Sequence, residues 1–203
     1  MSLELEAIYD YETLGQNSQT APVLSIAYLE FNSNKFYSSS PYEYDELLNL
    51  CGFVKFDVKD QIKNYGKKIE ADTAEWWQKQ GDEAKAVLKP TSMDKPLTFL
   101  PIALDMYFED FNKIKKCWTR GNTFDPLFMA QNMKDVGKSD PFKWWTIRDT
   151  RSFLDALLIG SDMDNKFVLP EWKDKFVAHD PRHDIVVDVL RMQSLVRAIH
   201  VDD

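Results

Sequence analysis

Acidic residues at the ends of predicted elements are the first feature of this sequence that could do chemistry. Asp10 and Glu12 end a run of aromatic and β-branched residues, 5–11, that predicts a strand. Residues two apart in a strand point to the same face, so the two carboxylates lie side by side. Hard divalent cations such as magnesium prefer oxygen ligands in this arrangement. For such a pair alone, two solvated acids at a strand end are the commoner explanation.

A third acid, Asp125, directly precedes Pro126. Aspartate followed by proline is also ordinary chemistry for the start of a helix, because the carboxylate caps free backbone amides and proline fits the first turn. A role for Asp125 in a site therefore requires other acids to converge on it.

A third acidic cluster, residues 179–188, contains two of the three histidines and precedes a predicted last helix. Pro181 fits the first helical turn, which leaves His179 in the loop and places Asp184 at the edge of the apolar face. Asp188 shares that flank, four residues later. The helix dipole also favours acids in a first turn, so a structural and a functional explanation are equally open here.

The hydrophobic pattern predicts the strands that would position these acids. Strands are expected over residues 5–11, 23–31 and 53–58, with turn-forming residues at 15–18 between the first two. A later strand that enters a turn is expected over residues 117–124.

Helices are predicted mainly in the second half. A capping box at Asp72 opens a helix that ends at Gln80, and helical spacing indicates further helices over residues 104–114, 150–158 and 185–199. Strands followed by helices that are interleaved with a later strand indicate an α/β fold, in which helices flank a mixed sheet.

The composition limits the classes of protein. The 203 residues amount to little more than one typical domain, so a single domain over residues 1–203 is expected. A net charge of −8 and a pI near 5.0 exclude binding of nucleic acid by bulk positive charge, but not by local basic patches. Cys51 and Cys117 are too few for a disulfide framework or a cysteine zinc site.

Nothing in the sequence favours a membrane protein. The apolar run 99–104 contains Pro101 and is too short to span a bilayer. Glu4 and Glu6 stand where a secretory signal would carry basic residues. We therefore expect a cytoplasmic protein with no membrane partner.

Three motifs follow one another along the chain: Asp10-x-Glu12-Thr-Leu-Gly, Arg120-Gly-x-x-Phe-Asp125 and His179-x-x-x-x-Asp184. In this order they resemble the motifs of DEDD-type 3′–5′ exonucleases, in the branch with a histidine in the third motif. Segments 75–77, 145–151 and 176–180 also resemble stretches of T-even phage members of this family. The likeness covers nearly the whole chain, and for a phage protein the cytoplasm would be that of the host.

The resemblance implies a ribonuclease H-like fold and a metal-dependent 3′–5′ exonuclease that releases 5′-mononucleotides. Two magnesium or manganese ions about 4 Å apart would activate a water and stabilise the leaving oxygen. The implied metal ligands are Asp10, Glu12, Asp125 and Asp184. His179 would be the general base. The implied substrate contacts are Thr13, Leu14, Arg120, Asn122 and Phe124.

Basic and aromatic residues could supply further contacts with nucleic acid. The candidates for phosphate are Lys113, Lys115, Lys116 and Arg120, or Arg148, Arg151 and Arg182. The tryptophans that could stack on bases of a frayed 3′ end are Trp76, Trp77, Trp118, Trp144 and Trp145. Packing in the core is expected for most of these tryptophans.

The third motif fits the sequence in two registers, because His183 and Asp188 repeat the spacing of His179 and Asp184. We prefer the earlier pair, which leaves its histidine on the loop and matches the flanking segment 176–178.

Two other functions compete with the exonuclease. One is a zinc hydrolase that uses His179 and His183, although Pro181 between them disrupts the usual helical spacing of such a pair. The other is a nucleic-acid-binding protein of the same fold without activity, which the complete set of acids disfavours. DNA is favoured over RNA as the substrate, and the alternatives of a monomer and a homodimer stay open.

Overall fold

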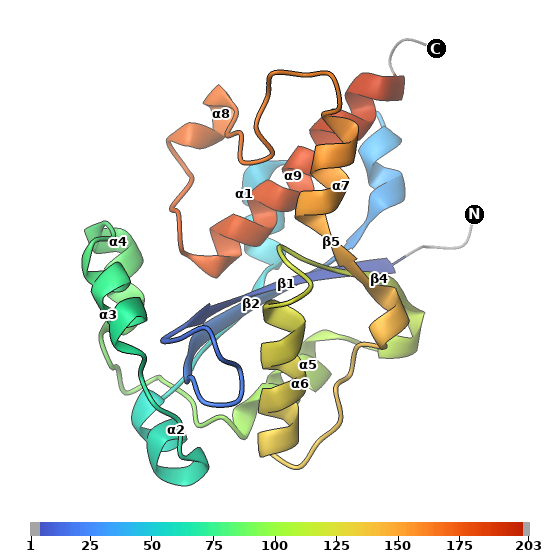
Figure 1. Ribbon diagram of the computed structural model, residues 1–203. Helices are drawn as coiled ribbons and strands as arrows, with labels where there is room; N and C mark the ends of the chain where they lie inside the picture. The colour runs from blue at the N-terminus through green and yellow to red at the C-terminus, as the bar shows by residue number, and fades with distance from the viewer. Residues whose placement is uncertain (1–4, 201–203) are drawn as a thin grey trace.

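The computed structural model describes residues 5–200, which form a five-stranded sheet with helices on both faces (Figure 1). The strands are β1 (Leu5–Thr13), β2 (Val23–Asn32), β3 (Gly52–Lys55), β4 (Ile114–Thr119) and β5 (Ile147–Asp149). They lie in the order β3-β2-β1-β4-β5, with β2 antiparallel to β1 and β3, and β4 parallel to β1 and β5. The expected mixed sheet is confirmed.

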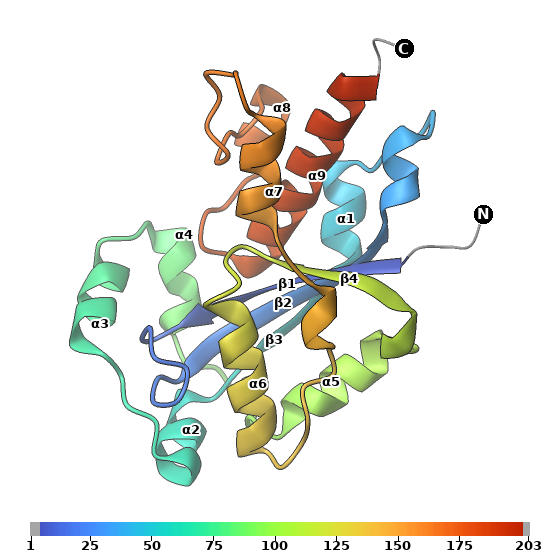
Figure 2. The ribbon, with the colours of Figure 1, turned by 45° about the vertical axis from the view of Figure 1, so that its right-hand side comes forward.

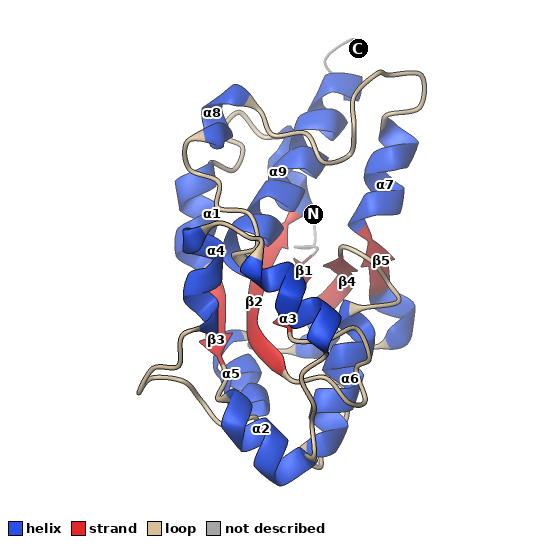
Figure 3. Ribbon diagram, turned by 60° about the vertical axis from the view of Figure 1, so that its left-hand side comes forward, coloured by secondary structure: helices blue, strands red, loops and turns tan. Residues whose placement is uncertain are grey.

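The helices form a layer on each face of this sheet. They are α1 (Tyr44–Leu50), α2 (Val58–Tyr65), α3 (Ala71–Gln78), α4 (Asp82–Lys85), α5 (Phe99–Tyr107), α6 (Asp125–Asp135), α7 (Thr150–Leu157), α8 (Pro170–Lys173) and α9 (Pro181–His200). Helices α1, α7, α8 and α9 lie on one face, and α5 and α6 lie on the other (Figure 2). Helices α3 and α4 stand beside the end of the sheet where β1 finishes (Figure 3).

The central strand β1 is buried on both faces. Ala7, Tyr9 and Tyr11 belong to the apolar cluster on the α5–α6 side, whereas Ile8 belongs to the cluster beneath α9. This alternation follows from the two-residue period of a strand. Side chains at even-numbered positions further along β1 therefore face α9.

The two long N-terminal strands are confirmed, each slightly longer than predicted. The prediction of a strand over residues 53–58 was too long, because β3 ends at Lys55. The Asp57 carboxylate then accepts hydrogen bonds from the backbone amides of Lys59 and Asp60 and so starts α2.

The prediction that Asp72 caps a helix was wrong. Helix α3 begins at Ala71, and Glu70 occupies the N-cap position. The Glu70 carboxylate does not cap α3 but accepts hydrogen bonds from the amides of Gln16 and Asn17, 2.9 and 3.2 Å away. Glu70 therefore joins the start of α3 to the turn between β1 and β2.

The predicted helix over residues 104–114 was wrong in its second half. Helix α5 ends at Tyr107, and β4 begins at Ile114. Between them, the Asp110 carboxylate accepts a hydrogen bond from the Asn112 amide, 2.9 Å away, and caps a short 3₁₀ turn. The apolar residues of this segment belong to a helix, a turn and a strand that pack in the same core. Their spacing in the sequence therefore resembles that of a single helical face.

The remaining predicted elements are present with small changes. The strand expected over residues 117–124 begins earlier, at Ile114, and ends at Thr119. Helices α7 and α9 match the prediction, and the apolar stripe that includes Ile185 and Val189 is buried. Of the helices within residues 5–200, none is long and apolar enough to cross a membrane.

A buried carboxylate joins β1 to its neighbours. Glu6 is 1% exposed and accepts hydrogen bonds from Trp118 Nε1 at 2.6 Å, from Ser33 Oγ at 2.6 Å and from Lys116 Nζ at 2.8 Å. Lys116, a phosphate-binding candidate from the sequence, is thereby engaged within the fold.

We predict that Glu6→Ala lowers the free energy of unfolding by about 1–3 kcal/mol, because it leaves the buried indole N–H of Trp118 without an acceptor. Urea denaturation followed by circular dichroism measures this change. Glu109→Ala is the matched control, since it removes an exposed carboxylate that pairs with Lys113, and it should leave stability nearly unchanged. Equal effects of the two variants would contradict the anchoring role of Glu6.

Candidate active site

Asp10 and Glu12 lie near the end of β1, on the face covered by α9. The residue between them, Tyr11, points to the opposite face, where its hydroxyl lies 3.6 Å from Met129 Sδ. Asp10 and Glu12 both pair with β2, whose register shifts directly after Glu12, whereas β4 pairs with β1 only over residues 5–8. The strand thus presents two carboxylates side by side, as the sequence predicts.

Asp125 is the first residue of α6 and is 2% exposed. The N-cap position belongs to Phe124, so the Asp125 side chain is not used as the cap of its own helix. Its Oδ1 instead accepts a hydrogen bond from the Tyr11 backbone amide, 3.1 Å away. This contact places the third carboxylate against β1, beside Asp10 and Glu12.

His179 lies in the loop before α9, as predicted, and has a backbone φ of 64°. Among the non-glycine residues described, it alone has a positive φ, a conformation that is sparsely populated for L-residues. The His179 amide donates a hydrogen bond to Asp184 Oδ2 at 3.0 Å. Asp184 in the first turn of α9 therefore stabilises the bend that brings the histidine to the site.

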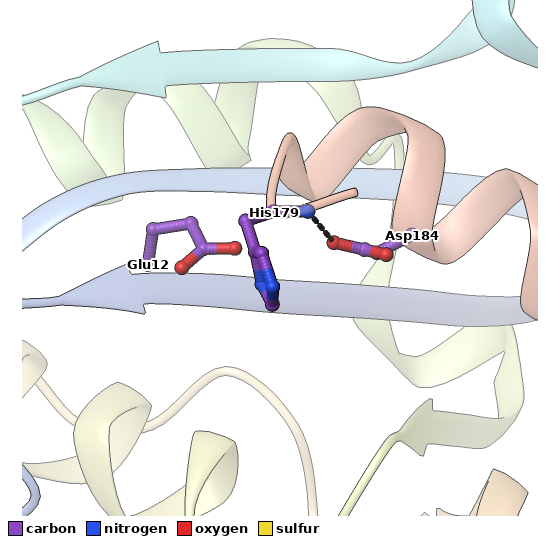
Figure 4. Close-up of side chains that lie close together, drawn as sticks. All are labelled: Glu12, His179 and Asp184. Carbon is purple, nitrogen blue, oxygen red and sulfur yellow. Dashed lines mark hydrogen bonds between the residues drawn. The ribbon is translucent and has the colours of Figure 1, made fainter. Parts of the chain in front are cut away.

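Three of these side chains meet closely. Ligand atoms of Glu12, His179 and Asp184 all lie within 4.8 Å of one another. Figure 4 shows the His179 imidazole between the two carboxylates, with the hydrogen bond from its backbone to Asp184. Asp10 and Asp125 line the same cavity, which has a volume of 640 Å³. The structure thus brings together the five predicted metal-binding and catalytic residues.

Burial and repulsion from nearby acids raise the pKa of all four carboxylates. Burial is the main cause for Asp10 and Glu12, and repulsion from the other acids of the site adds to it, so their pKa values lie well above the ordinary range. Burial, together with repulsion from Asp188, raises the pKa of Asp125 and of Asp184 to about 7. Hydrogen bonds to Asp125 and Asp184 only partly offset this rise. Such a cluster fits cations that compensate its charge.

Asp188, the acid of the alternative register, lines the same cavity but is paired with cationic side chains. Its carboxylate accepts hydrogen bonds from Arg120 at 2.8 Å, from Arg191 at 2.7 Å and from the Thr150 hydroxyl at 2.6 Å. Asp188 is 2% exposed. Two guanidinium groups already compensate its charge, and its contacts tie the residue that follows β4, and α7, to α9.

His183 also points away from the acids. Its Nδ1 lies 2.7 Å from the Tyr44 hydroxyl of α1, and its ring packs on the Tyr44 ring. His183 is not among the residues that line the cavity. The geometry therefore brings the pair His179–Asp184 to the site, and does not bring His179 and His183 together as the zinc alternative requires.

The predicted substrate contacts divide into two groups. Arg120 and Phe124 line the cavity. Thr13, Leu14 and Asn122 do not line it. The Thr13 hydroxyl donates to a carbonyl of its own turn, 2.7 Å away, and Leu14 is buried in an apolar cluster with Trp77 of α3.

Cationic residues also line the cavity that holds the acids. Of the phosphate-binding candidates, Arg120 and Arg151 line the cavity, and the sequence analysis missed Lys166 and Arg191, which line it as well. Arg120 and Arg191 are bound to Asp188, whereas Lys166 lies in a loop with no sequence signal to single it out.

The expectation that most of the five tryptophans pack in the core was wrong. Trp77 and Trp118 are buried, but Trp76, Trp144 and Trp145 are 40%, 82% and 55% exposed. Only Trp76 of these three lies against a site residue, since its ring contacts that of His179.

The family of the chain follows from a match over most of its length. Residues 6–190 match the model of the 3′–5′ exoribonuclease Rv2179c-like domain, a span that includes β1, α6 and the first half of α9. The chain belongs to this exonuclease family. The predicted membership of the metal-dependent DEDD-type 3′–5′ exonucleases is confirmed.

Individual relatives of this exonuclease agree with that assignment. The exodeoxyribonuclease of enterobacteria phage T4 is 30% identical over 206 residues, which cover 94% of this chain and 88% of the phage protein. The likeness to T-even phage members of the family is therefore confirmed. The chain is a 3′–5′ exonuclease, and this sets aside the zinc hydrolase and the inactive binding protein.

Solved structures of E. coli exonuclease I share the fold. Its complex with a 5cy-dA13 oligonucleotide has a TM-score of 0.60 and 17% identity over 96% of this chain. The zinc-bound form of its complex with single-stranded DNA has a TM-score of 0.59 and 13% identity over 97% of this chain. The exonuclease spans about two fifths of the length of those chains. The ribonuclease H-like fold is thereby confirmed.

The raised pKa of Asp125 predicts how stability depends on pH. Because the folded pKa, about 7, exceeds the ordinary value of 3.8, the stability linked to this group is fully present below about pH 4 and is lost as the pH rises through 7. In metal-free protein, Asp125→Asn should therefore become more stable than wild type by on the order of 1–4 kcal/mol at pH 8, but not at pH 4.

Urea denaturation of both proteins in chelator, at several pH values, measures this difference. Asparagine can still accept the hydrogen bond from the Tyr11 amide, so the variant changes charge rather than shape. Asp162→Asn, at an exposed aspartate outside the cavity, is the control and should follow wild type. A difference that does not change with pH would contradict the proposed repulsion.

Proposed function

We propose that this exonuclease removes 5′-mononucleotides from the 3′ end of DNA, with two magnesium or manganese ions held by four acids of its cavity. The proposed ligands are Asp10, Glu12, Asp125 and Asp184. The observation that carries the proposal is the convergence of these carboxylates with His179 in one cavity.

The donor set fits hard divalent cations. Four carboxylates supply oxygen ligands, which magnesium and manganese prefer to sulfur or imidazole. Among the described residues, no ion pair to Lys or Arg compensates any of the four. Bound ions would supply a nucleophilic hydroxide and stabilise the leaving oxygen.

His179 is suited to take a proton from the attacking water. Burial lowers the pKa of its imidazole from the ordinary value, so that the ring is neutral and able to accept a proton at neutral pH. The hydrogen bond from its backbone amide to Asp184 fixes the loop beside the acid cluster, and a ring nitrogen lies within 4.8 Å of carboxylate oxygens of Glu12 and Asp184. Asp180, two residues before Arg182, is paired with that arginine and leaves His179 free for this role.

The cations of the cavity would bind the phosphates of the substrate. Arg151 and Lys166 form no ion pair among the described residues, and both line the cavity that holds the acids. Arg120 also donates a hydrogen bond to Asp188, and the aromatic ring of Phe124 lines the cavity. DNA is proposed as the substrate because the phage T4 relative is an exodeoxyribonuclease, while the family name includes RNA.

Digestion of end-labelled oligonucleotides tests the proposal. Single- and double-stranded DNA and RNA, labelled at the 5′ end, are incubated with magnesium, manganese, zinc or chelator. We expect shortening from the 3′ end of DNA, release of 5′-mononucleotides and dependence on magnesium or manganese. Faster digestion of RNA would contradict the choice of substrate, and activity in chelator would contradict the role of the acids.

A pair of histidine variants tests which register acts. His179→Ala should lower kcat by about 10²–10⁴-fold, the range for loss of a general base. Binding of manganese, measured by calorimetry, should change little, because a residue that contacts the water is not required as a ligand.

His183→Ala is the matched control, since it removes the histidine that lies against Tyr44 outside the cavity. It should retain kcat within about threefold of wild type, since a residue outside the reacting geometry contributes little to the barrier. Loss of activity in His183→Ala alone would show that the site uses the later register.

A further inference from the structure

Within the described part of the chain, a hydrogen bond holds the backbone of His179 but not its imidazole ring. The backbone amide is fixed by Asp184, but among the described residues no hydrogen bond reaches either ring nitrogen. The ring is also only partly enclosed by the fold. Rotation about the side-chain bonds would therefore move the ring away from the acids unless another group restrains it.

Trp76 of α3 supplies that restraint. Its ring centroid lies 4.8 Å from that of His179, with an interplanar angle of 81°, an edge-to-face contact. The Trp77 ring lies further away, at 6.3 Å and 75°. Rings in this geometry attract one another because the positive edge of one meets the negative face of the other.

The position of Trp76 is fixed by its neighbour. Trp77 is 1% exposed, packs with Leu14, Leu24 and Ala84, and donates a hydrogen bond from Nε1 to the Thr13 carbonyl at 2.9 Å. The Trp76 and Trp77 rings contact each other edge to face, with centroids 5.2 Å apart. Since Thr13 follows Glu12 directly, α3 is attached to the same strand end that carries the first acids.

Core packing does not account for Trp76. Its side chain is 40% exposed and belongs to none of the buried clusters. It also does not line the cavity that holds the acids, whereas His179 does. A large aromatic residue that remains partly exposed beside one catalytic candidate points to a role exerted through that candidate.

We propose that Trp76 is a positioning residue that holds the His179 imidazole toward the acid cluster. This inference rests on the proposed role of His179 as general base. Trp76 contacts the histidine ring from α3. Asp184 holds the histidine backbone from α9 (Figure 4). The contact thus joins α3 to the loop before α9, although the two segments are about one hundred residues apart in sequence.

Steady-state kinetics of Trp76 variants on a DNA oligonucleotide tests the proposal. Trp76→Ala should lower kcat by about 10- to 100-fold, the loss expected for a misplaced catalytic group, with little change in KM. Trp76→Phe keeps an aromatic face and should recover kcat to within about threefold of wild type. Trp144→Ala, at an exposed tryptophan outside the cavity, is the control and should retain wild-type kcat.

A second measurement needs neither metal nor activity. The chain has three histidines, so the Cε1–H resonances are few and can be assigned with His→Ala variants. In metal-free protein, Trp76→Ala should shift the His179 resonance, because the ring current of the indole is lost, and should leave that of His183 in place. Thermal unfolding of each variant shows that the fold is retained.

The outcomes separate this inference from the proposed function. If wild type shortens DNA from the 3′ end but Trp76→Ala keeps its kcat, the positioning role is overturned and the function stands. A raised KM with unchanged kcat also overturns it, because Trp76 would then contact the substrate. An unshifted His179 resonance overturns it even if the function itself fails.

Discussion

Repulsion among four carboxylates is the constraint on which the architecture around the site depends. In an unfolded chain, the four carboxylates would be solvated by water and far apart. In the folded chain, the end of β1 and the first turns of α6 and α9 hold them in one cavity. The positive ends of two helix dipoles, α6 at Asp125 and α9 at Asp184, reduce the penalty. Beneath them, Asp188 binds Arg120 and Arg191, which adds positive charge near the cluster without occupying its oxygens. These positive charges reduce the repulsion among the four acids, and bound cations would reduce it further.

Much of the fold could be predicted because local pattern and tertiary structure agree there. The sequences of β1 and β2 contain alternating or consecutive apolar residues, and α9 carries one continuous apolar stripe. The prediction failed over residues 104–114, where apolar side chains at helical spacing come from a helix, a turn and a strand. Only the capping of the turn by Asp110 distinguishes these three elements from one continuous helix, and such a contact has a weak signal in a single sequence. The short helices α1 and α2 were not predicted for the same reason.

The acids of the site were predicted from their order along the chain, but their environment was not. The sequence offers His179–Asp184 and His183–Asp188 at the same spacing, and only the fold shows that Asp188 is bound by two arginines. Leu14 was expected to contact the substrate, but its burial with Trp77 depends on α3, which lies more than fifty residues further along. Lys166 and the contact of Trp76 with His179 depend on loops that no periodic pattern describes.

The acids come from β1, from the start of α6 and from the start of α9, so the span that encodes the site runs from residue 10 to residue 184. Neither the strand nor either helix alone holds enough oxygens to bind and orient two hard cations. During synthesis, β1 leaves the ribosome long before Asp184 does, and the emerging chain carries only isolated acids. The proposed ligand set is thus complete only when α9 lies on the sheet, so the last ligand to be synthesised is also the one that closes the site.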